Sequence, residues 1–244
     1  KIIEVTRDTT LQRIEEDNNI IFKPNDGPQT DFLAASEREV LYGGSAGGGK
    51  SYAMLADPLR YMGHPAFSGL LLRHTTEELR ELIFKSQEMY PKIWPGIKWS
   101  ERKMQWTAPS GARLWMSYLD REDDVLRYQG LAFSWIGFDE LTQCATPYAW
   151  NYMRSRLRST APDLPIFMRA TTNPGGRGHS WVKKMFIDPA VPNVTFDATD
   201  IETGEILKYP VGHEKAGITL FKRRFIPARL RDNPDLARQG DYEA

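Results

Sequence analysis

Short apolar runs alternate with longer amphipathic segments along the chain, which predicts alternating strands and helices. The apolar and β-branched runs that we expect to form strands are residues 39–42, 69–74, 112–119, 133–138 and 166–170. Because helical segments separate these runs, we expect an α/β fold with a mostly parallel central sheet flanked by helices.

Three segments show the spacing of amphipathic helices. Residues 51–61 follow a glycine-rich loop, and residues 76–90 open with the capping sequence Thr75-Thr76-Glu77-Glu78. A third helix is predicted to begin at Pro147, because proline suits a first helical turn. Its expected apolar face consists of Trp150, Met153 and Leu157.

Two further segments predict antiparallel strands at the edge of the sheet. Residues 104–119 form a predicted hairpin that turns at residues 108–111, where proline and glycine occur together. Residues 194–225 are expected to form more strands around the turn at Thr203-Gly204. Their scattered acids, Asp197, Asp200 and Glu202, are expected on a hairpin surface.

Composition adds limits to this picture. With 244 residues, of which 41% are hydrophobic, the chain can form one large globular domain with a substantial core. No apolar run approaches the roughly 20 residues that span a bilayer, and the charged N-terminal sequence has no signal-peptide core, so we expect neither a membrane segment nor export. Cys144 is the only cysteine, which excludes an intramolecular disulfide, and the four histidines have no metal-ligand spacing.

The charges balance, with 32 basic and 32 acidic residues, so net charge does not indicate a nucleic-acid partner. Basic residues nevertheless gather late in the chain, at residues 154–158, 222–224 and 229–231. Arg154 and Arg158 stand four apart on the third predicted helix, where they would either bind phosphate or form an ordinary solvated face.

The sequence GGSAGGGKS at residues 43–51 is typical of a phosphate-binding loop. Residues 44–51 satisfy G-x-x-x-x-G-K-[ST] after a predicted strand and before a predicted helix, a context that disfavours a merely flexible loop with a chance lysine. Backbone N–H groups would bind phosphate oxygens, Lys50 would reach the β- and γ-phosphates, and Ser51 would hold Mg²⁺. The candidate nucleotide-binding residues are Gly44, Ser45, Ala46, Gly47, Gly48, Gly49, Lys50 and Ser51.

An acidic pair, Asp139-Glu140, ends the apolar run at 133–138. In a parallel sheet this end opens into the crevice that also receives the phosphate loop. Alone, such a pair is a common solvated cap, but beside a phosphate loop it favours catalysis, with Asp139 in the Mg²⁺ shell and Glu140 acting on the attacking water. The second carboxylate serves water better than a bulky acceptor, which favours an ATPase over a small-molecule kinase.

The sequence RATTNPGG at 169–176 ends another apolar run with hydroxyl and amide side chains. Such groups can bind a γ-phosphate or its water and respond when that phosphate leaves, and Asn173 is the best placed. The alternative is a plain turn, because Asn-Pro-Gly-Gly is good turn chemistry.

In this order and spacing, GGSAGGGKS, LRYQG before FSWIGFDEL, and RATTNPGG resemble the ATPase domain of the large terminase subunit of tailed bacteriophages and related viruses. The resemblance runs from about residue 22 to 231. It implies a RecA-type P-loop ATPase core that uses ATP and Mg²⁺ to drive double-stranded DNA into a procapsid.

The resemblance also implies roles for individual residues. Lys50 and Ser51 match the Walker A residues, Asp139 and Glu140 match the Walker B acids, and residues 171–173 match the coupling segment that senses hydrolysis. Gln29 resembles the upstream glutamine that reads adenine, since an amide can pair with both donor and acceptor positions of that base.

One departure concerns arginine. Many large terminases carry an arginine within the phosphate loop, but here Ser45 and Ala46 fill the variable positions. The charge-neutralising arginine is therefore expected elsewhere: Arg127 in LRYQG first, acting from a neighbouring subunit, then Arg73, then Arg102. Each has the alternative of being simply a surface arginine or an ion-paired arginine.

The family also implies partners and domain limits. We expect a lead-in at 1–28, an ATPase core at 29–231 and, at 232–244, the start of a linker to an absent nuclease domain, so that this chain does not cut DNA. The expected partners are double-stranded DNA, the portal protein, the small terminase subunit and further copies in a ring, in the host cytoplasm and transiently on the procapsid, without a membrane. Open alternatives are another nucleic-acid-dependent P-loop ATPase, such as a helicase or DNA translocase, and a nucleotide switch without turnover.

Overall fold

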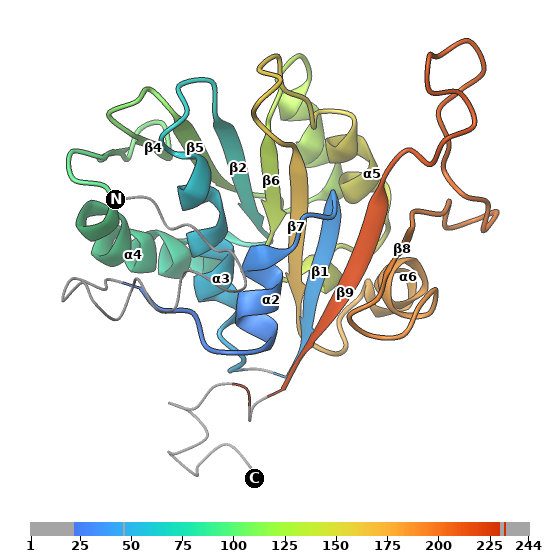
Figure 1. Ribbon diagram of the computed structural model, residues 1–244. Helices are drawn as coiled ribbons and strands as arrows, with labels where there is room; N and C mark the ends of the chain where they lie inside the picture. Colours follow the sequence, from blue (N-terminus) through green and yellow to red (C-terminus); the bar gives the residue numbers. More distant parts are fainter. Residues whose placement is uncertain (1–21, 46, 230–231, 233–244) are drawn as a thin grey trace, which may run out of the picture.

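A nine-stranded sheet forms the centre of the computed structural model, which describes residues 22–45, 47–229 and 232 (Figure 1). The strand order is β3-β4-β5-β2-β6-β7-β1-β9-β8. The six strands from β5 to β9 in that order are parallel, while β3, β4 and β8 run antiparallel at the two edges. The strands are β1 (Glu39–Gly44), β2 (Ser68–Arg73), β3 (Lys98–Ser100), β4 (Gln105–Thr107), β5 (Arg113–Tyr118), β6 (Trp135–Phe138), β7 (Phe167–Thr172), β8 (Thr195–Asp197) and β9 (Lys222–Ala228).

Helices cover both faces of the sheet, as Figure 1 shows. Successive residues of β1 contribute to different hydrophobic cores, one on each face of the sheet. Val40 and Tyr42 belong to the core on one face, and Leu41 belongs to the core on the opposite face. The first group is α2 (Pro28–Ala34), α3 (Lys50–Ala56), η1 (Asp57–Tyr61) and α4 (Thr76–Ile93). The opposite face carries η2 (Glu122–Tyr128), η3 (Leu141–Gln143), α5 (Tyr148–Arg154), α6 (His179–Val182) and η4 (Lys183–Ile187).

The predicted α/β class and all five predicted strands are confirmed, with limits that shift by up to two residues. The hairpin at 104–119 is also confirmed: β4 pairs antiparallel with β5, and Gly111 in the turn has a φ of 94°. The expectation for 194–225 is wrong in part. β8 pairs antiparallel with β9, but β9 lies parallel beside β1 and extends the central sheet, because Ile226 and Ala228 are buried there.

The helix predictions need corrections at their ends. The segment 51–61 divides into α3 and the 3₁₀ helix η1, where Pro58 lacks the N–H that an α-helix requires. α4 begins as predicted, with the Thr75 hydroxyl accepting a hydrogen bond from Glu78 N at 3.3 Å. α5 begins at Tyr148 and ends at Arg154, so Leu157 is buried beyond the helix rather than on its face.

Two of the basic residues that gather late in the chain form ion pairs with a buried carboxylate. Glu39, fully buried at the start of β1, pairs with Arg154 and with Arg223, the latter at 2.8 Å. Arg154 therefore neutralises a buried carboxylate, and Arg158 lies outside α5, so these two residues do not form the single helix face that the sequence predicted. No helix within the described part of the chain has the length and apolar character needed to cross a membrane.

Candidate active site

The glycine-rich loop leaves the carboxyl end of β1 and enters α3. Gly44, Gly47 and Gly49 have φ values of 139°, 80° and 71°, which side chains rarely adopt. A Cβ on Gly44 would lie 1.9 Å from the Ala228 carbonyl oxygen of β9, so this position requires glycine. Ser45 N donates to the same oxygen at 3.0 Å. The predicted nucleotide-binding residue Ala46 lies outside the described residues.

Lys50 lies at the first position of α3, and its side chain turns back over the loop. Its ammonium group donates to the carbonyl oxygens of Gly44, at 3.3 Å, and Ser45. Only 8% of the residue is exposed. Burial lowers the pKa of Lys50 to about 8, against the opposing effect of the Asp139 and Glu140 charges.

The acidic pair follows β6, between β2 and β7 in the sheet. Asp139 is 3% exposed; one carboxylate oxygen accepts from the Thr171 hydroxyl at the end of β7, and the other from Arg73 at the end of β2. Glu140 has a φ of 60°, a value that is uncommon for a residue with a side chain, and its backbone N–H donates to the Thr171 hydroxyl at 3.1 Å. A single threonine therefore orients both acids.

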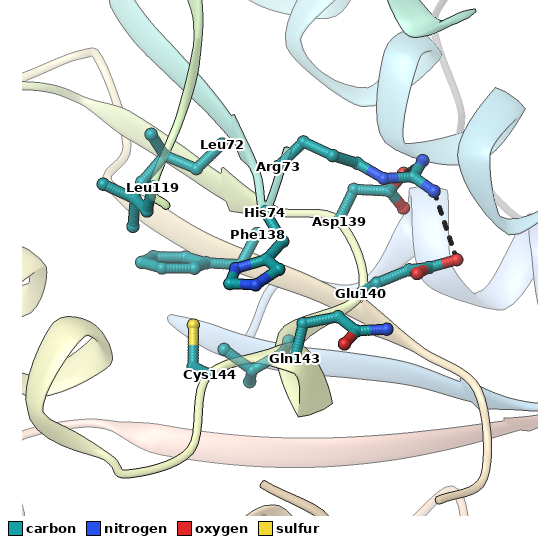
Figure 2. Close-up of a pocket in the computed structure, with 10 residues that line it drawn as sticks. Leu72, Arg73, His74, Leu119, Phe138, Asp139, Glu140, Gln143 and Cys144 are labelled. Atoms are coloured by element: carbon teal, nitrogen blue, oxygen red, sulfur yellow. Dashed lines mark hydrogen bonds and ion pairs between the residues drawn. The ribbon is translucent and has the colours of Figure 1, made fainter. Parts of the chain in front are cut away.

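Arg73 contacts three carboxylates. Its guanidinium pairs with Asp139, lies 3.2 Å from Glu140 Oε1 and lies 3.6 Å from Glu78 Oε2 on α4. Figure 2 shows Arg73 and Glu140 facing each other at one side of a pocket that Asp139 also lines. The guanidinium is nearly buried beside these acids. Its positive charge therefore compensates the negative charges that the acids carry in the folded protein.

The segment after β7 reaches the same acids. Asn173 Nδ2 donates to Glu140 Oε1 at 3.2 Å, whereas Asn173 Oδ1 is buried without a hydrogen-bond partner among the described residues. Thr142 supports this segment: its hydroxyl accepts from Thr172 at 2.8 Å and lies 3.4 Å from the Asn173 carbonyl oxygen. The predicted turn is therefore also a direct contact with the acidic pair.

Gln29, in α2, lies beside the phosphate loop rather than in an open cleft. Its amide nitrogen donates to the Gly49 carbonyl at 2.9 Å, and its amide oxygen accepts from Asn25 N at 2.6 Å. A side-chain amide has two donors and two lone pairs, so one of each remains for a further partner. The structure thus joins Gln29 to the loop that the sequence placed 15 residues away.

The three candidate arginines lie in different places. Arg73 is at the acidic pair, as described. Arg127, in η2, pairs at 3.0 Å with Asp124 and lies over the ring of Tyr118 at the end of β5. Arg102 is exposed in the turn between β3 and β4. Within one chain, only Arg73 contacts the acids among these three.

Sequence reasoning ranked Arg73 second and missed Glu78 and Thr142. The position of Arg73 at the end of an apolar run was visible in the sequence. Its contact with Asp139 depends on β2 lying next to β6, and strand order was not part of the predicted pattern. Thr142 carried no signal, because a threonine shortly after an acidic pair has no characteristic spacing.

A phosphate loop between β1 and α3, together with an acidic pair at the end of β6 in a mostly parallel sheet, defines the P-loop ATPase fold class. The model of the family described as phage terminase large subunit matches residues 36–207. The chain belongs to that family. Among curated protein sequences, none matches the chain.

Solved structures of large terminases share the fold. The large terminase of a thermophilic bacteriophage is 15% identical, with a TM-score of 0.60 over 89% of this chain and 48% of that one. The same protein in complex with ADP gives 16% identity and a TM-score of 0.58 over the same shares. The large terminase ATPase domain of Thermus phage P74-26 is 12% identical, with a TM-score of 0.58, over 95% of this chain and 89% of that one. The chain thus spans about half the length of the first of these proteins.

Proposed function

We propose that this chain is the ATP-hydrolysing motor domain that powers packaging of double-stranded viral DNA into the procapsid. One observation carries the proposal: the phosphate loop follows β1 and the acidic pair Asp139-Glu140 follows β6, so both lie at the carboxyl-end edge of the same parallel sheet. Family membership supplies the DNA-packaging context. The position of a phosphate-loop sequence at the same sheet edge as an acidic pair also supports the proposal, because such acids can act on a metal ion and a water molecule.

The residues present fit a nucleotide with Mg²⁺. Ser51 and Asp139 offer the oxygen ligands that Mg²⁺ prefers, and Asp139 is already oriented by Thr171. Asn173 Oδ1 is a buried acceptor without a described partner, which fits a water molecule that donates to it. Bound Mg²⁺ would neutralise charge on the phosphates during hydrolysis.

In this proposal, Lys50 binds the phosphates and Glu140 activates the attacking water. Lys50 exchanges its contacts with the Gly44 and Ser45 carbonyls for phosphate oxygens, because a charged ligand compensates its burial better than neutral carbonyls do. Glu140 acts as the general base. Both Arg73 and Asn173 contact Oε1 of Glu140, so Oε2 is the oxygen that accepts the proton from water.

Two arginines have separate proposed roles. Arg73 holds the acidic pair together within the chain, as its contacts support. Arg127 has only local contacts and is accessible, which supports a role at the active site of a neighbouring copy. Gln29 would read adenine with its remaining donor and lone pair while it holds Gly49.

The wider assembly is part of the proposal. The chain would act as a ring of copies on the portal, with double-stranded DNA and the small terminase subunit as partners, in the host cytoplasm and transiently on the procapsid. We propose residues 29–231 as the ATPase core, residues 1–28 as a lead-in, and residues 232–244 as the start of a linker to a nuclease domain.

The test is ATP turnover of Glu140→Gln and Glu78→Gln, measured with and without duplex DNA and at rising protein concentration. Loss of the general base should lower kcat by about 10²- to 10⁴-fold with nucleotide binding retained. Glu78→Gln is the matched control, because it also removes a carboxylate next to Arg73 but leaves the acid that acts on water, and it should keep turnover within a few-fold. Equal turnover in Glu140→Gln and the wild type would contradict the proposal, and strand separation would indicate a helicase instead.

A further inference from the structure

An arm of the chain projects beyond the sheet edge formed by β8 and β9. It comprises residues 198–221, which connect these two strands, and it extends away from the body at the upper right of Figure 1. Isolated bridges pair Thr199 with Ile206 and Lys208 with Thr219, and Tyr209 N donates to the Ile218 carbonyl at 2.9 Å. The arm is therefore a hydrogen-bonded ribbon rather than an irregular loop.

This ribbon exposes apolar and acidic side chains together. Val211 at its tip is fully exposed, Ile218 is 59% exposed and Ile206 is 43% exposed. An isolated two-stranded ribbon is marginally stable in water, and exposed aliphatic groups add to its need for a facing surface. Its charged residues are four carboxylates, Asp200, Glu202, Glu205 and Glu214, against two lysines, Lys208 and Lys215.

The opposite edge of the same sheet has the complementary character. We call it the basic edge; its exposed cations are Lys98, Arg102, Lys103 and Arg113, and its single acid is Glu101. Trp99 and Met104 at this edge pack against the core but are only half-buried, so the edge also offers apolar surface. The strand order places β3 and β8 at the two ends of the sheet, which means that one chain cannot bring its own arm to its own basic edge.

We propose that the arm docks on the basic edge of a second copy of this chain. Val211 and Ile218 would cover Trp99 and Met104, and the arm's carboxylates would face Lys98 and the turn cations. Charge complementarity selects this occupant over DNA, whose phosphates the acidic arm repels. The contact is head-to-tail, so successive copies extend in one direction and form a ring if the rotation between them closes.

The geometry also agrees with the proposed role of Arg127. This residue lies over Tyr118 at the end of β5, on the side of the basic edge. The phosphate loop follows β1, which pairs with β9 on the side of the arm. Head-to-tail packing therefore brings the Arg127 side of one copy toward the phosphate-loop side of the next. The docking rests on the proposed function, because it specifies the interface between copies in the proposed ring. The test of the docking requires no nucleotide, so the docking and the proposed ATPase function can fail separately.

Sedimentation velocity over a concentration series tests the contact. Two variants reverse charge on one side each: Glu202→Lys with Glu205→Lys in the arm, and Lys98→Glu with Lys103→Glu in the basic edge. Each should weaken self-association by at least about tenfold, because like charges then face each other. Mixing the two variants should restore association between them, since the reversed faces are again complementary. Glu88→Lys, exposed on α4, is the matched control and should associate as the wild type does.

Cross-linking identifies the faces directly. Chains with Val211→Cys and chains with Lys103→Cys, both with Cys144→Ala, are mixed and treated with a short bismaleimide. The mixture should give a heterodimer in higher yield than a mixture of Val211→Cys with Glu88→Cys. Circular dichroism and thermal unfolding of each variant check that it is folded.

Three results would overturn the proposal: a wild type that stays monomeric up to its solubility limit, association unchanged in both charge variants, or equal cross-linking to Lys103→Cys and Glu88→Cys. Association lost in each variant alone and regained on mixing supports it, because a fold defect in either variant would not be repaired by the other.

Discussion

Replacing Lys50 by methionine should make the folded protein more stable at neutral pH while it abolishes nucleotide binding. The residue is 8% exposed and has only two backbone carbonyls as hydrogen-bond partners for its charge among the described residues. A buried ammonium group without a directly bonded anion is costly, and methionine has a similar length without the charge. Stability and function therefore conflict at this position.

The pKa of Lys50 gives the magnitude. Burial lowers it from 10.5 to about 8, which corresponds to a penalty of up to about 3 kcal/mol on the charged form at pH 7. Methionine also loses the bonds to Gly44 and Ser45, worth about 1 kcal/mol each. The net gain in the free energy of unfolding is therefore about 1 kcal/mol, or a rise in Tm of about 2–4 °C for a chain of this size.

The pH dependence has a definite sign. Because the folded pKa lies below the unfolded one, the folded state binds fewer protons than the unfolded state between pH 8 and 10.5. The penalty is therefore full below pH 8 and disappears as the pH rises toward 10.5. The advantage of Lys50→Met should be largest at pH 7 and lost above about pH 10, where the missing hydrogen bonds leave the variant less stable than the wild type.

Urea unfolding at pH 7 and pH 10 measures both effects. Lys92→Met, at an exposed position near the end of α4, is the control and should show no comparable pH-dependent gain. Thermal shifts with an ATP analogue and Mg²⁺ should appear for the wild type and be absent for Lys50→Met. The reasoning is wrong if Lys50→Met is less stable than the wild type at pH 7, or if its advantage is the same at both pH values.

Three further substitutions test other parts of the site. Arg127→Ala should lower concentration-dependent ATP turnover by about 10³-fold or more while nucleotide binding and Tm stay unchanged, because the side chain has only a local pair; unchanged turnover would refute the assignment. Arg73→Ala leaves Asp139 buried without its cation, which should lower the free energy of unfolding by about 3 kcal/mol. Added Mg²⁺ should restore part of this stability, and a Tm equal to that of the wild type would contradict the role of Arg73 in holding the acidic pair. Gln29→Ala should reduce the preference for ATP over GTP in competition assays by about fivefold or more, and should weaken binding of both, since Gly49 loses its partner; an unchanged preference would exclude adenine recognition.

Sequence alone determined the features that are encoded by neighbouring residues. The phosphate loop depends on glycines, which tolerate a left-handed backbone conformation, followed directly by Lys50 and Ser51. A contiguous stretch of residues was therefore enough to predict it. The acidic pair was equally visible, because Asp139 and Glu140 come directly after a buried strand. Strand and helix positions followed from periodicity, which is also a local property.

Tertiary structure alone decided how these parts meet. Arg73 contacts Asp139 because β2 lies beside β6, and the buried Glu39 accepts from Arg223, 184 residues later, because β9 lies beside β1. Strand order is set by how apolar faces and buried charges are satisfied over the whole sheet, and no short stretch of sequence encodes it. The same holds for the arm and the basic edge: each is an ordinary surface segment in the sequence, and only the finished sheet places them at opposite ends of one molecule.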